Sequence, residues 1–270
     1  MEGYSVGRMS SMIENRNSGI LFYMKNILVT GVSRGMGEAT TRLLVQKGYF
    51  VYGVYNTNKT EAVKLVEELK NIKIFQCDFS NRRNTALLLK ELSEVTFDGI
   101  VNSAGVFIPI EFNVLNMQDW DKTVEINFTT PLLIVHGLKD QLADGASIVN
   151  ISSIDGMIGS VTGIAYAASK AALLNLTKSL AIILAKKKVR VNAIAPGWIG
   201  DGMQAPPELL KEAAEMNPLK RNGTYEEIAQ LVLFLLTDWS SYVNGTTITI
   251  DGGDTATSEI YLKEAEMLSP

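Results

Sequence analysis

The sequence has very few of the residues that build metal centres and disulfide frameworks. Its 270 residues include one cysteine, Cys77, and one histidine, His136. A single cysteine excludes a disulfide within the chain and a zinc site with several cysteine ligands. Because chains without disulfides are typical of reducing compartments, we predict a cytoplasmic protein, and we predict no metal site.

Long apolar runs and basic clusters are also scarce. The apolar stretch 19–24 is too short for a membrane span or a signal segment, and no later segment reaches the roughly 18 uninterrupted apolar residues of a span. The formal net charge is −4, and the longest basic run is Lys186–Lys188. We therefore predict that neither a membrane nor a nucleic acid is a partner.

Support for a hydrolase is also scarce, because the two matches to G-x-S-x-G, the motif that carries the nucleophile of many hydrolases, are G-Y-S-V-G at 3–7, ahead of the first predicted strand, and G-V-S-R-G at 31–35, inside a glycine-rich segment. His136 lies at helical spacing from Leu132 and Leu133, which indicates a packed or surface side chain rather than a catalytic one. The sequence therefore disfavours a serine hydrolase built on this histidine.

The sequence does contain a regular alternation of short apolar runs with segments of helical periodicity, which implies a parallel sheet covered on both faces. We predict one α/β domain over 24–253, after a flexible extension over 1–23 in which Met24 could be the natural start, and before a polar tail over 254–270. Strands are predicted over 26–30, 50–55, 72–77, 99–102, 146–151, 189–195 and 246–250. Helices are predicted over 36–46, 59–70, 82–92, 119–142 (kinked or broken at Pro131), 165–186, 207–216 and 224–236.

The most informative pair of residues is Tyr166 and Lys170, with Ser153 thirteen residues before the tyrosine. Side chains four residues apart share one face of a helix. An ammonium beside a phenol favours the phenolate, so we expect Lys170 to lower the pKa of Tyr166 from its usual value near 10. A tyrosine tuned in this way can serve as a general acid or base at neutral pH. Taken singly, each residue could equally be structural.

A glycine-rich segment, T-G-V-S-R-G-M-G at 30–37, follows the first predicted strand and opens the first helix. Glycines allow the backbone to approach a pyrophosphate, and a helix N-terminus supplies N–H donors and positive potential. The spacing is G-x-x-x-G-x-G rather than G-x-G-x-x-G. A loop of this kind can also serve tight packing alone, so the motif is weak in isolation.

Further candidate residues lie at the ends of other predicted strands. The segment N-S-A-G at 102–105 follows the fourth strand, beside the crevice where open parallel sheets bind ligands. Asp78 follows the third strand and could accept a hydrogen bond from an adenine amino group, or could cap the next helix. The second strand ends at Tyr55, Asn56 and Thr57 without the acid that NAD sites place there. Because Arg34 could instead bind a 2′-phosphate, NADP(H) is favoured over NAD(H), although Arg34 could also be a solvated charge.

Together these motifs resemble the short-chain dehydrogenase/reductase family over roughly residues 24–253. The resemblance rests on the glycine-rich loop, Asp78, the N-S-A-G segment, Asn127, Ser153, the Tyr166/Lys170 pair, N-A-I-A-P-G at 192–197, Gly245 and D-G-G at 251–253. Within the family, N-P-L-K-R at 217–221 and the segment 224–253 look most like the 3-oxoacyl-acyl-carrier-protein reductase group.

The resemblance implies a Rossmann-type, doubly wound sheet of seven parallel strands in the order 3-2-1-4-5-6-7. It implies that Tyr166 exchanges the proton, that Lys170 lowers its pKa and holds the nicotinamide ribose, that Ser153 binds the substrate oxygen, and that Asn127 supports a water chain to Lys170. It also implies a homotetramer. The predicted cofactor-binding residues are Gly31, Ser33, Arg34, Gly35, Met36, Gly37, Tyr55, Asn56, Thr57, Asp78, Phe79, Asn102, Ala104, Gly105, Tyr166, Lys170, Pro196, Gly197 and Ile199.

Two positions depart from the family pattern. Asp201 stands where the family usually has a cofactor-contacting threonine, and its carboxylate would repel phosphates or accept from a carboxamide. Ile182 stands where the carrier-protein reductases usually have an arginine that meets the acidic carrier, which weakens the case for that substrate. Trp198 is predicted to line the substrate site, beneath a segment 203–216 that covers it, although it could instead cap the edge of the core.

The predicted function is NADP(H)-dependent reduction of a carbonyl, or oxidation of an alcohol, by hydride transfer at a Ser-Tyr-Lys-Asn site. An activity like that of 3-oxoacyl-acyl-carrier-protein reductases is favoured, and oxidation of a sugar or polyol is the close alternative. A non-catalytic dinucleotide-binding sensor, and a hydrolase or lyase that uses the same tyrosine, are the other classes considered.

Overall fold

The computed structural model describes residues 12–14, 21–258, 260–261, 264 and 267. Two three-residue strands, β1 (Met12–Glu14) and β2 (Leu21–Tyr23), pair antiparallel within the predicted N-terminal extension. The rest of that extension, and several positions of the predicted tail, lie outside the described residues. Among the described residues, no helix is long and apolar enough to cross a membrane.

A sheet of seven parallel strands forms the centre of the molecule. Its order is β5-β4-β3-β6-β7-β8-β9, which confirms the predicted order, and the topological switch point lies between β3 and β6. The strands are β3 (Asn26–Thr30), β4 (Phe50–Tyr55), β5 (Ile72–Gln76), β6 (Phe97–Asn102), β7 (Leu142–Ile151), β8 (Arg190–Pro196) and β9 (Thr247–Ile250).

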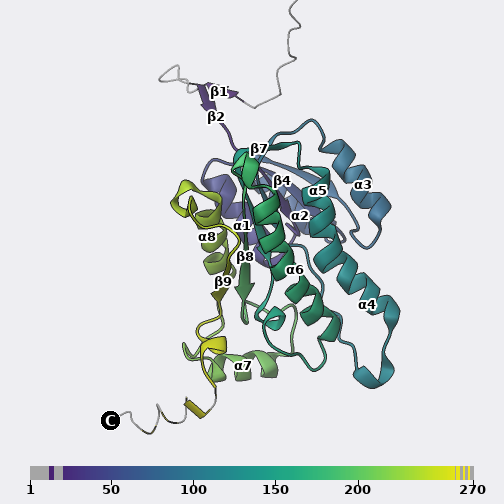
Figure 1. The fold of residues 1–270 in the computed structure, drawn as a ribbon, viewed down its shortest axis with the longest axis vertical. Helices are drawn as coiled ribbons and strands as arrows, with labels where there is room; N and C mark the ends of the chain where they lie inside the picture. Colours follow the sequence, from purple (N-terminus) through teal and green to yellow (C-terminus); the bar gives the residue numbers. More distant parts are fainter. Residues whose placement is uncertain (1–11, 15–20, 259, 262–263, 265–266, 268–270) are drawn as a thin grey trace, which may run out of the picture.

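Helices cover both faces of this sheet (Figure 1). One face carries α1 (Gly35–Gln46), α2 (Lys59–Glu68) and α8 (Tyr225–Leu236). The other carries α3 (Arg82–Glu91), α5 (Thr130–Gly137) and α6 (Ile164–Ile183), with α4 (Met117–Val124) packed on α6. Short 3₁₀ turns add η1 (Phe112–Val114), η3 (Ile154–Gly156), η4 (Ala185–Lys187), η5 (Asp238–Ser240) and η6 (Asp254–Ala256).

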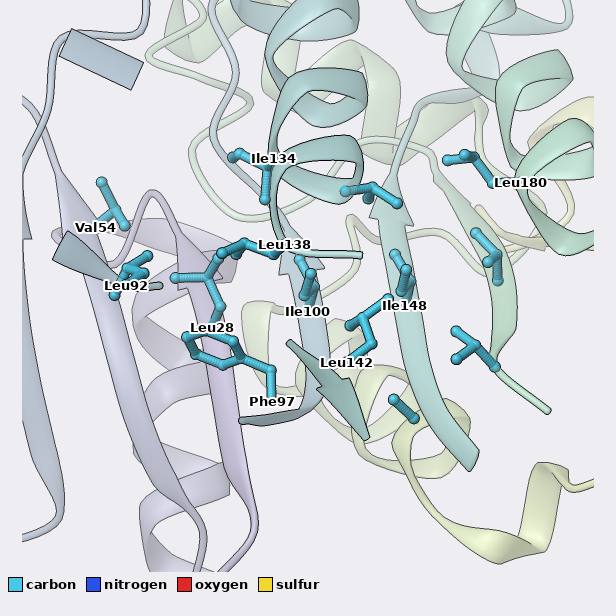
Figure 2. Close-up of a cluster of buried hydrophobic side chains, with 14 of the residues drawn as sticks. Leu28, Val54, Leu92, Phe97, Ile100, Ile134, Leu138, Leu142, Ile148 and Leu180 are labelled. Carbon is cyan, nitrogen blue, oxygen red and sulfur yellow. The ribbon is translucent and has the colours of Figure 1, made fainter. Parts of the chain in front are cut away.

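Each face of the sheet has its own apolar core. In Figure 2, Leu28, Ile100 and Ile148 come from the neighbouring strands β3, β6 and β7, and Leu138 at the end of α5 lies near them. The opposite core joins Leu44 of α1 and other side chains of α1, α2 and α8 to the other faces of the strands. Two buried faces explain why the strands read as continuous apolar runs rather than alternating ones. Helix α7 (Pro207–Met216) lies beyond the carboxyl ends of β8 and β9 (Figure 1).

The helix predicted over 119–142 is wrong in detail. The chain forms α4, a π-helical segment η2 (Glu125–Thr129) and α5, and it then enters β7 at Leu142, four residues before the predicted start of that strand. Pro131, in the first turn of α5, has no N–H to continue a regular hydrogen-bond ladder. The helix is therefore irregular near Pro131, but the irregularity is a π-turn within a continuous run of helical residues rather than a break, and such turns are often found at functional sites.

Candidate functional site

The candidate site lies at the carboxyl ends of β3 and β6, where two loops pack against each other. Thr30, the last residue of β3, accepts hydrogen bonds through Oγ1 from the N–H groups of Ser103 and Ala104, at 3.0 and 2.9 Å. Gly31 has a φ of +78°, and a β-carbon there would lie 3.0 Å from the Ala104 Cα. The glycine-rich loop and the N-S-A-G segment are therefore adjacent, as the sequence predicts.

The first turn of α1 is open to an anion. A β-carbon on Gly37 would collide with the Gly31 carbonyl, so only glycine allows the loop to fold back this tightly. Arg34 occupies the N-cap position, and no side chain caps the helix. The first N–H groups of α1 thus keep their donors and their share of the helix dipole for a ligand. Ser33 and Met36 lie half-buried in the same loop and turn.

The predicted catalytic trio comes together behind these loops. Ser153 lies at the end of the β7 region and caps η3 by accepting from the Asp155 N–H at 3.1 Å. Tyr166 lies on α6, with its phenol close enough to the Ser153 hydroxyl to be influenced by it. Lys170, one turn further along α6, places its Nζ 5.5 Å from the centroid of the tyrosine ring. The three side chains are 9%, 9% and 4% exposed, so they share a largely desolvated site.

Lys170 is held in place by one hydrogen bond from its side chain and another to its backbone carbonyl. Its Nζ donates to the Ile151 carbonyl at 2.8 Å, and its own carbonyl accepts from Ser152 Oγ at 2.9 Å. Burial lowers the pKa of Lys170 from 10.5 to about 8. The ammonium is still the main form at neutral pH, but burial of its charge destabilises the folded protein.

The expectation that the pKa of Tyr166 lies below its usual value near 10 is wrong for this structure. Burial raises the pKa of the phenol to about 12; the nearby Ser153 hydroxyl acts in the opposite direction, and the Asp155 carboxylate acts in the same direction as burial. Desolvation outweighs the favourable neighbours because the tyrosine is nearly inaccessible to water. At neutral pH the phenol is therefore protonated and can act as a proton donor.

Asn127 is held in the π-helical segment η2 and braces the same site. Its Oδ1 accepts from the Val106 N–H at 2.9 Å, and its Nδ2 donates to the Val106 carbonyl at 2.9 Å and to Ser169 Oγ at 3.2 Å. A β-carbon on Gly105 would lie 3.4 Å from Asn127 Oδ1 and 3.5 Å from Lys170 Nζ. The amide and the ammonium therefore face the same small space beside Gly105, which is where the family resemblance implies a relay between them.

The predicted nucleotide end of the site is much more open. Arg34, Asn56 and Thr57 are exposed, whereas Tyr55 is buried at the end of β4. Asp78 accepts from the Ser80 N–H at 2.9 Å.

The N-cap of α3 distinguishes the two roles predicted for Asp78, which are contact with an adenine and capping of that helix. The side chain that caps α3 belongs to Asn81, which accepts from the Arg83 N–H, so the alternative role of Asp78 as helix cap is not observed. Phe79, next to Asp78, is buried, and its carbonyl accepts from Thr130 Oγ1 at 3.4 Å. Asn102 donates to Asn150 Oδ1 at 2.8 Å, which ties β6 to β7 below the site.

The loop after β8 completes the edge of the site. Pro196 ends β8, and the Gly197 N–H donates to the Ile250 carbonyl at 3.1 Å. Ile199 is buried, whereas Trp198 is half-buried and borders a cleft of about 350 Å³ shared with Leu219 and Asp251.

Two residues near the trio were missed by sequence reasoning. The Phe107 ring packs edge-on against Tyr166, with centroids 5.3 Å apart, and Asp155 acts on the pKa of the same phenol. Asp155 follows Ser153 by two residues, so the sequence could have predicted that it lies near the trio. The sequence could not have predicted the same of Phe107, because its contact depends on the path of the loop after β6. The described residues contain no group of three or more His, Cys, Asp or Glu side chains that could hold a metal ion.

Comparison with known proteins finds relatives that match most of the chain. A family model described as enoyl-(acyl carrier protein) reductase matches residues 31–255. The 3-oxoacyl-acyl-carrier-protein reductase FabG of Thermotoga maritima is 35% identical over 241 residues, which cover 85% of this chain and 97% of the relative. The acetoacetyl-CoA reductase of Rhizobium meliloti is 36% identical over 235 residues, covering 84% of this chain and 96% of the relative.

Solved structures share the fold over nearly the same length. A blue fluorescent protein from a metagenomic library, crystallised in complex with NADPH, superposes with a TM-score of 0.80 at 29% identity. That alignment covers 85% of this chain and 97% of the other. A short chain dehydrogenase family protein from Francisella tularensis superposes with a TM-score of 0.77 at 32% identity, covering 87% of this chain and 100% of the other.

Proposed function

Because the chain belongs to the short-chain dehydrogenase/reductase family of oxidoreductases, we propose that it is an NADP(H)-dependent carbonyl reductase that acts through Ser153, Tyr166 and Lys170. One observation carries the proposal: a protonated, desolvated tyrosine lies close to a serine hydroxyl and beside a buried ammonium, at the sheet edge where the uncapped turn of α1 opens. This arrangement supplies a proton and a positive charge beside a site suited to a pyrophosphate.

The residues present fit a dinucleotide. The uncapped α1 turn and the close glycine-rich loop would hold the pyrophosphate. When bound, the nicotinamide supplies the hydride, and the protein supplies orientation and electrostatics. Lys170 would contact the nicotinamide ribose, and the main chain near Ile199 would meet the carboxamide.

The proton steps follow from the geometry of the trio. Ser153 donates to the substrate oxygen and fixes its position, while Tyr166 gives its proton to that oxygen as negative charge develops there. The Lys170 ammonium stabilises the phenolate that remains, at a distance where its charge is poorly screened because both groups are buried. Asn127 holds the wall of the site beside Lys170 through its two hydrogen bonds with Val106.

The preference for NADP(H) over NAD(H) rests on Arg34 and on the lack of an acid where β4 ends. The residues that follow the strand, Asn56 and Thr57, are exposed and neutral, so nothing there repels a phosphate. Arg34 is exposed beside the uncapped turn of α1 and can offer its guanidinium fork to a 2′-phosphate. Solved relatives in complex with NADPH support the same preference.

A 3-oxoacyl thioester is the substrate class that we favour. The loop between Ser153 and Tyr166 exposes Met157, Ile158 and Val161, an apolar rim suited to an acyl chain. Two of the relatives named above act on such acyl groups, as their names state. The lack of an arginine at Ile182, which is 78% exposed, favours a coenzyme A thioester over an acidic carrier protein.

A sugar or polyol remains the second candidate because of one observation. The Asp155 carboxylate lies close enough to Tyr166 to raise the pKa of its phenol. A carboxylate at that place can accept hydrogen bonds from hydroxyl groups next to the reacting carbon.

Steady-state assays of the purified protein test the proposal. We expect NADPH oxidation with acetoacetyl-CoA, at a kcat/KM at least tenfold higher than with NADH, and slower NADP⁺ reduction with a panel of aldoses. The reverse order of the two substrates would select the sugar or polyol. If neither substrate class changed the NADPH absorbance although NADPH bound, the non-catalytic sensor would replace the reductase.

A further inference from the structure

A tyrosine outside the catalytic trio bridges two loops of the predicted dinucleotide site. The Tyr225 hydroxyl donates to Asp201 Oδ1 at 2.6 Å and accepts from the Asp201 N–H at 3.1 Å. The same carboxylate oxygen also accepts a hydrogen bond from the Met203 N–H at 3.1 Å, which stabilises the turn at 201–203. Asp201 is the residue that stands where the family usually has a cofactor-contacting threonine. Its carboxylate is therefore already bound by a phenol.

Tyr225 is held rigidly at the start of α8. The preceding Thr224 caps the helix through a capping box, in which Thr224 Oγ1 accepts from the Glu227 N–H at 3.2 Å and Glu227 Oε2 accepts from the Thr224 N–H at 2.8 Å. Arg221 Nη2 adds an ion pair with Glu227 Oε1 at 2.7 Å. The phenol therefore projects from a helix end whose backbone is fixed.

The loop after β8, which Tyr225 contacts through Asp201, has a less regular backbone than the start of α8. The Gly200 N–H donates to the Gly223 carbonyl at 2.9 Å, and the Gly223 N–H donates to the Trp198 carbonyl at 2.9 Å. Beyond this pairing, Gly200, Gly202, Met203 and Gln204 all have positive φ values. Because two of these four are not glycines, the turn that leads to α7 is conformationally costly and depends on its side-chain contacts.

The same aromatic ring reaches the glycine-rich loop. A β-carbon on Gly35 would lie 3.4 Å from Tyr225 Cε1, and one on Gly200 would collide with the ring. The ring therefore packs against Gly35 on one side and Gly200 on the other. Arg34, beside Gly35, lowers the pKa of the phenol, but burial and Asp201 raise it, so the hydroxyl remains a donor at neutral pH.

We propose that Tyr225 is a positioning residue of the dinucleotide site, which holds the glycine-rich loop and the loop after β8 at one fixed spacing through Gly35, Gly200 and Asp201. The inference rests on the proposed function, because these are the two loops that would contact the phosphates and the carboxamide. The phenol also partly neutralises Asp201, since a charge-assisted hydrogen bond spreads the carboxylate charge away from the phosphates. Removal of the Tyr225 hydroxyl would release the loop after β8 and would also leave the Asp201 carboxylate without the hydrogen bond that partly neutralises it.

Four variants test this role by the dissociation constant and dissociation rate of NADPH, followed by nicotinamide fluorescence. Tyr225→Phe keeps the ring and removes the hydroxyl, whereas Asp201→Ala removes the acceptor. Asp201→Asn keeps an oxygen acceptor and removes the charge, and the double variant Asp201→Ala/Tyr225→Phe completes a cycle. Tyr242→Phe, at a fully exposed tyrosine (102% exposed), is the matched control.

We expect Tyr225→Phe to weaken NADPH binding by about tenfold, mainly through faster dissociation, with kcat at saturating NADPH within about twofold of the parent. Asp201→Ala should weaken binding to a similar extent, the double variant no further than either single one, and Asp201→Asn by less than about threefold. Additive effects of the two single changes, or unchanged or tighter binding in Tyr225→Phe, would overturn the proposal. Failure of the unmodified protein to bind NADPH or NADP⁺ would instead overturn the proposed function.

Discussion

The two ends of the candidate site are built in opposite ways. At the catalytic end, Tyr166, Lys170 and Asn127 are between 1% and 9% exposed, and fixed partners hold the lysine and the amide. At the nucleotide end, Arg34 and Asn56 are exposed at the rim. Buried polar groups with fixed partners define one geometry, whereas exposed side chains define a charge but not a conformation.

This difference assigns separate properties to the two ends. The rate of the chemical step should depend steeply on single atoms at the catalytic end, because nothing there can rearrange without loss of a buried hydrogen bond. Selection between cofactors should depend on charge at the nucleotide end, where substitutions cost little stability. The following substitutions test that division, from the largest expected effect to the smallest.

Replacement of Tyr166 by phenylalanine should lower kcat by about 10³-fold, because it removes only the hydroxyl that donates the proton. The Phe107 ring contact is kept, so NADPH affinity and thermal stability should stay close to those of the parent. Stopped-flow measurement of a single turnover, combined with NADPH titration, checks both expectations. Unchanged turnover would remove Tyr166 from the mechanism.

Replacement of Lys170 by methionine should lower kcat by about 10²-fold and should raise the melting temperature by several degrees. The gain in stability follows from the removal of a buried charge whose pKa is lowered from 10.5 to about 8. Below about pH 8 the folded parent carries this charge at full cost, and the cost disappears as the pH rises toward 10.5, where the unfolded chain also loses its proton.

The stability of the parent should therefore rise relative to that of Lys170→Met between pH 8 and 10.5, as urea unfolding at several pH values would measure. Lys178→Met, at an exposed lysine on the same helix, is the control and should show neither effect. A lower melting temperature for Lys170→Met would mean that the bond to the Ile151 carbonyl outweighs the cost of burial.

Reversal of charge at Arg34, by substitution with glutamate, should weaken NADPH binding by about tenfold and leave NADH binding nearly unchanged. The ratio of kcat/KM values for the two cofactors reports the change directly. Lys186→Glu makes the same change in net charge at the opposite end of the sheet, in the turn before β8, and should not alter the ratio. Equal losses with both cofactors would assign Arg34 to the pyrophosphate rather than to the 2′-phosphate.

Replacement of Asp155 by asparagine should have the smallest effect, because with a 3-oxoacyl substrate the carboxylate influences the reaction only through the charge that it places near Tyr166. Its loss should lower the pKa of the phenol, which Asp155 helps to raise. Alcohol oxidation, which needs the phenolate, should then be about two- to fivefold faster at pH 7, while reduction should lose activity at a lower pH than in the parent. A rate profile between pH 6 and 10 separates this shift from a change in substrate binding, which would alter KM alone.

Sequence reasoning was strongest where a signal is local. The apolar runs of β3, β4 and β8 predicted strands because burial on both faces leaves no alternation, and Gly48, with a φ of +86°, marked the end of α1. The order of the strands came from the family resemblance. The pairing of Tyr166 with Lys170 was predicted from spacing alone, because one turn of α6 is enough to bring them to one face, whereas the role of Ser153 came from the family resemblance.

The remaining features depend on contacts that the sequence does not encode locally. Asp201 and Tyr225 are 24 residues apart in unrelated elements, so their hydrogen bond had no periodic signal. The raised pKa of Tyr166 depends on its burial, which a local pairing with Lys170 could not reveal. Pro131 predicted a kink or break, but only the structure shows that the hydrogen-bond register changes to a π-turn.

That π-turn has a consequence for how the chain can tolerate insertions and deletions. A π-turn holds one residue more than a regular helix would need, and each residue of an α-helix turns it by about 100°. If the same residues formed a regular helix, α5 would be rotated relative to α4 by that angle and Ile134 would turn away from the core it fills. Deletion of a single residue between Glu125 and Thr129 would instead keep Ile134 in place but remove the widened turn that carries Asn127. The surplus residue therefore works as a spacer, which allows Asn127 to face the site while α5 still faces the sheet.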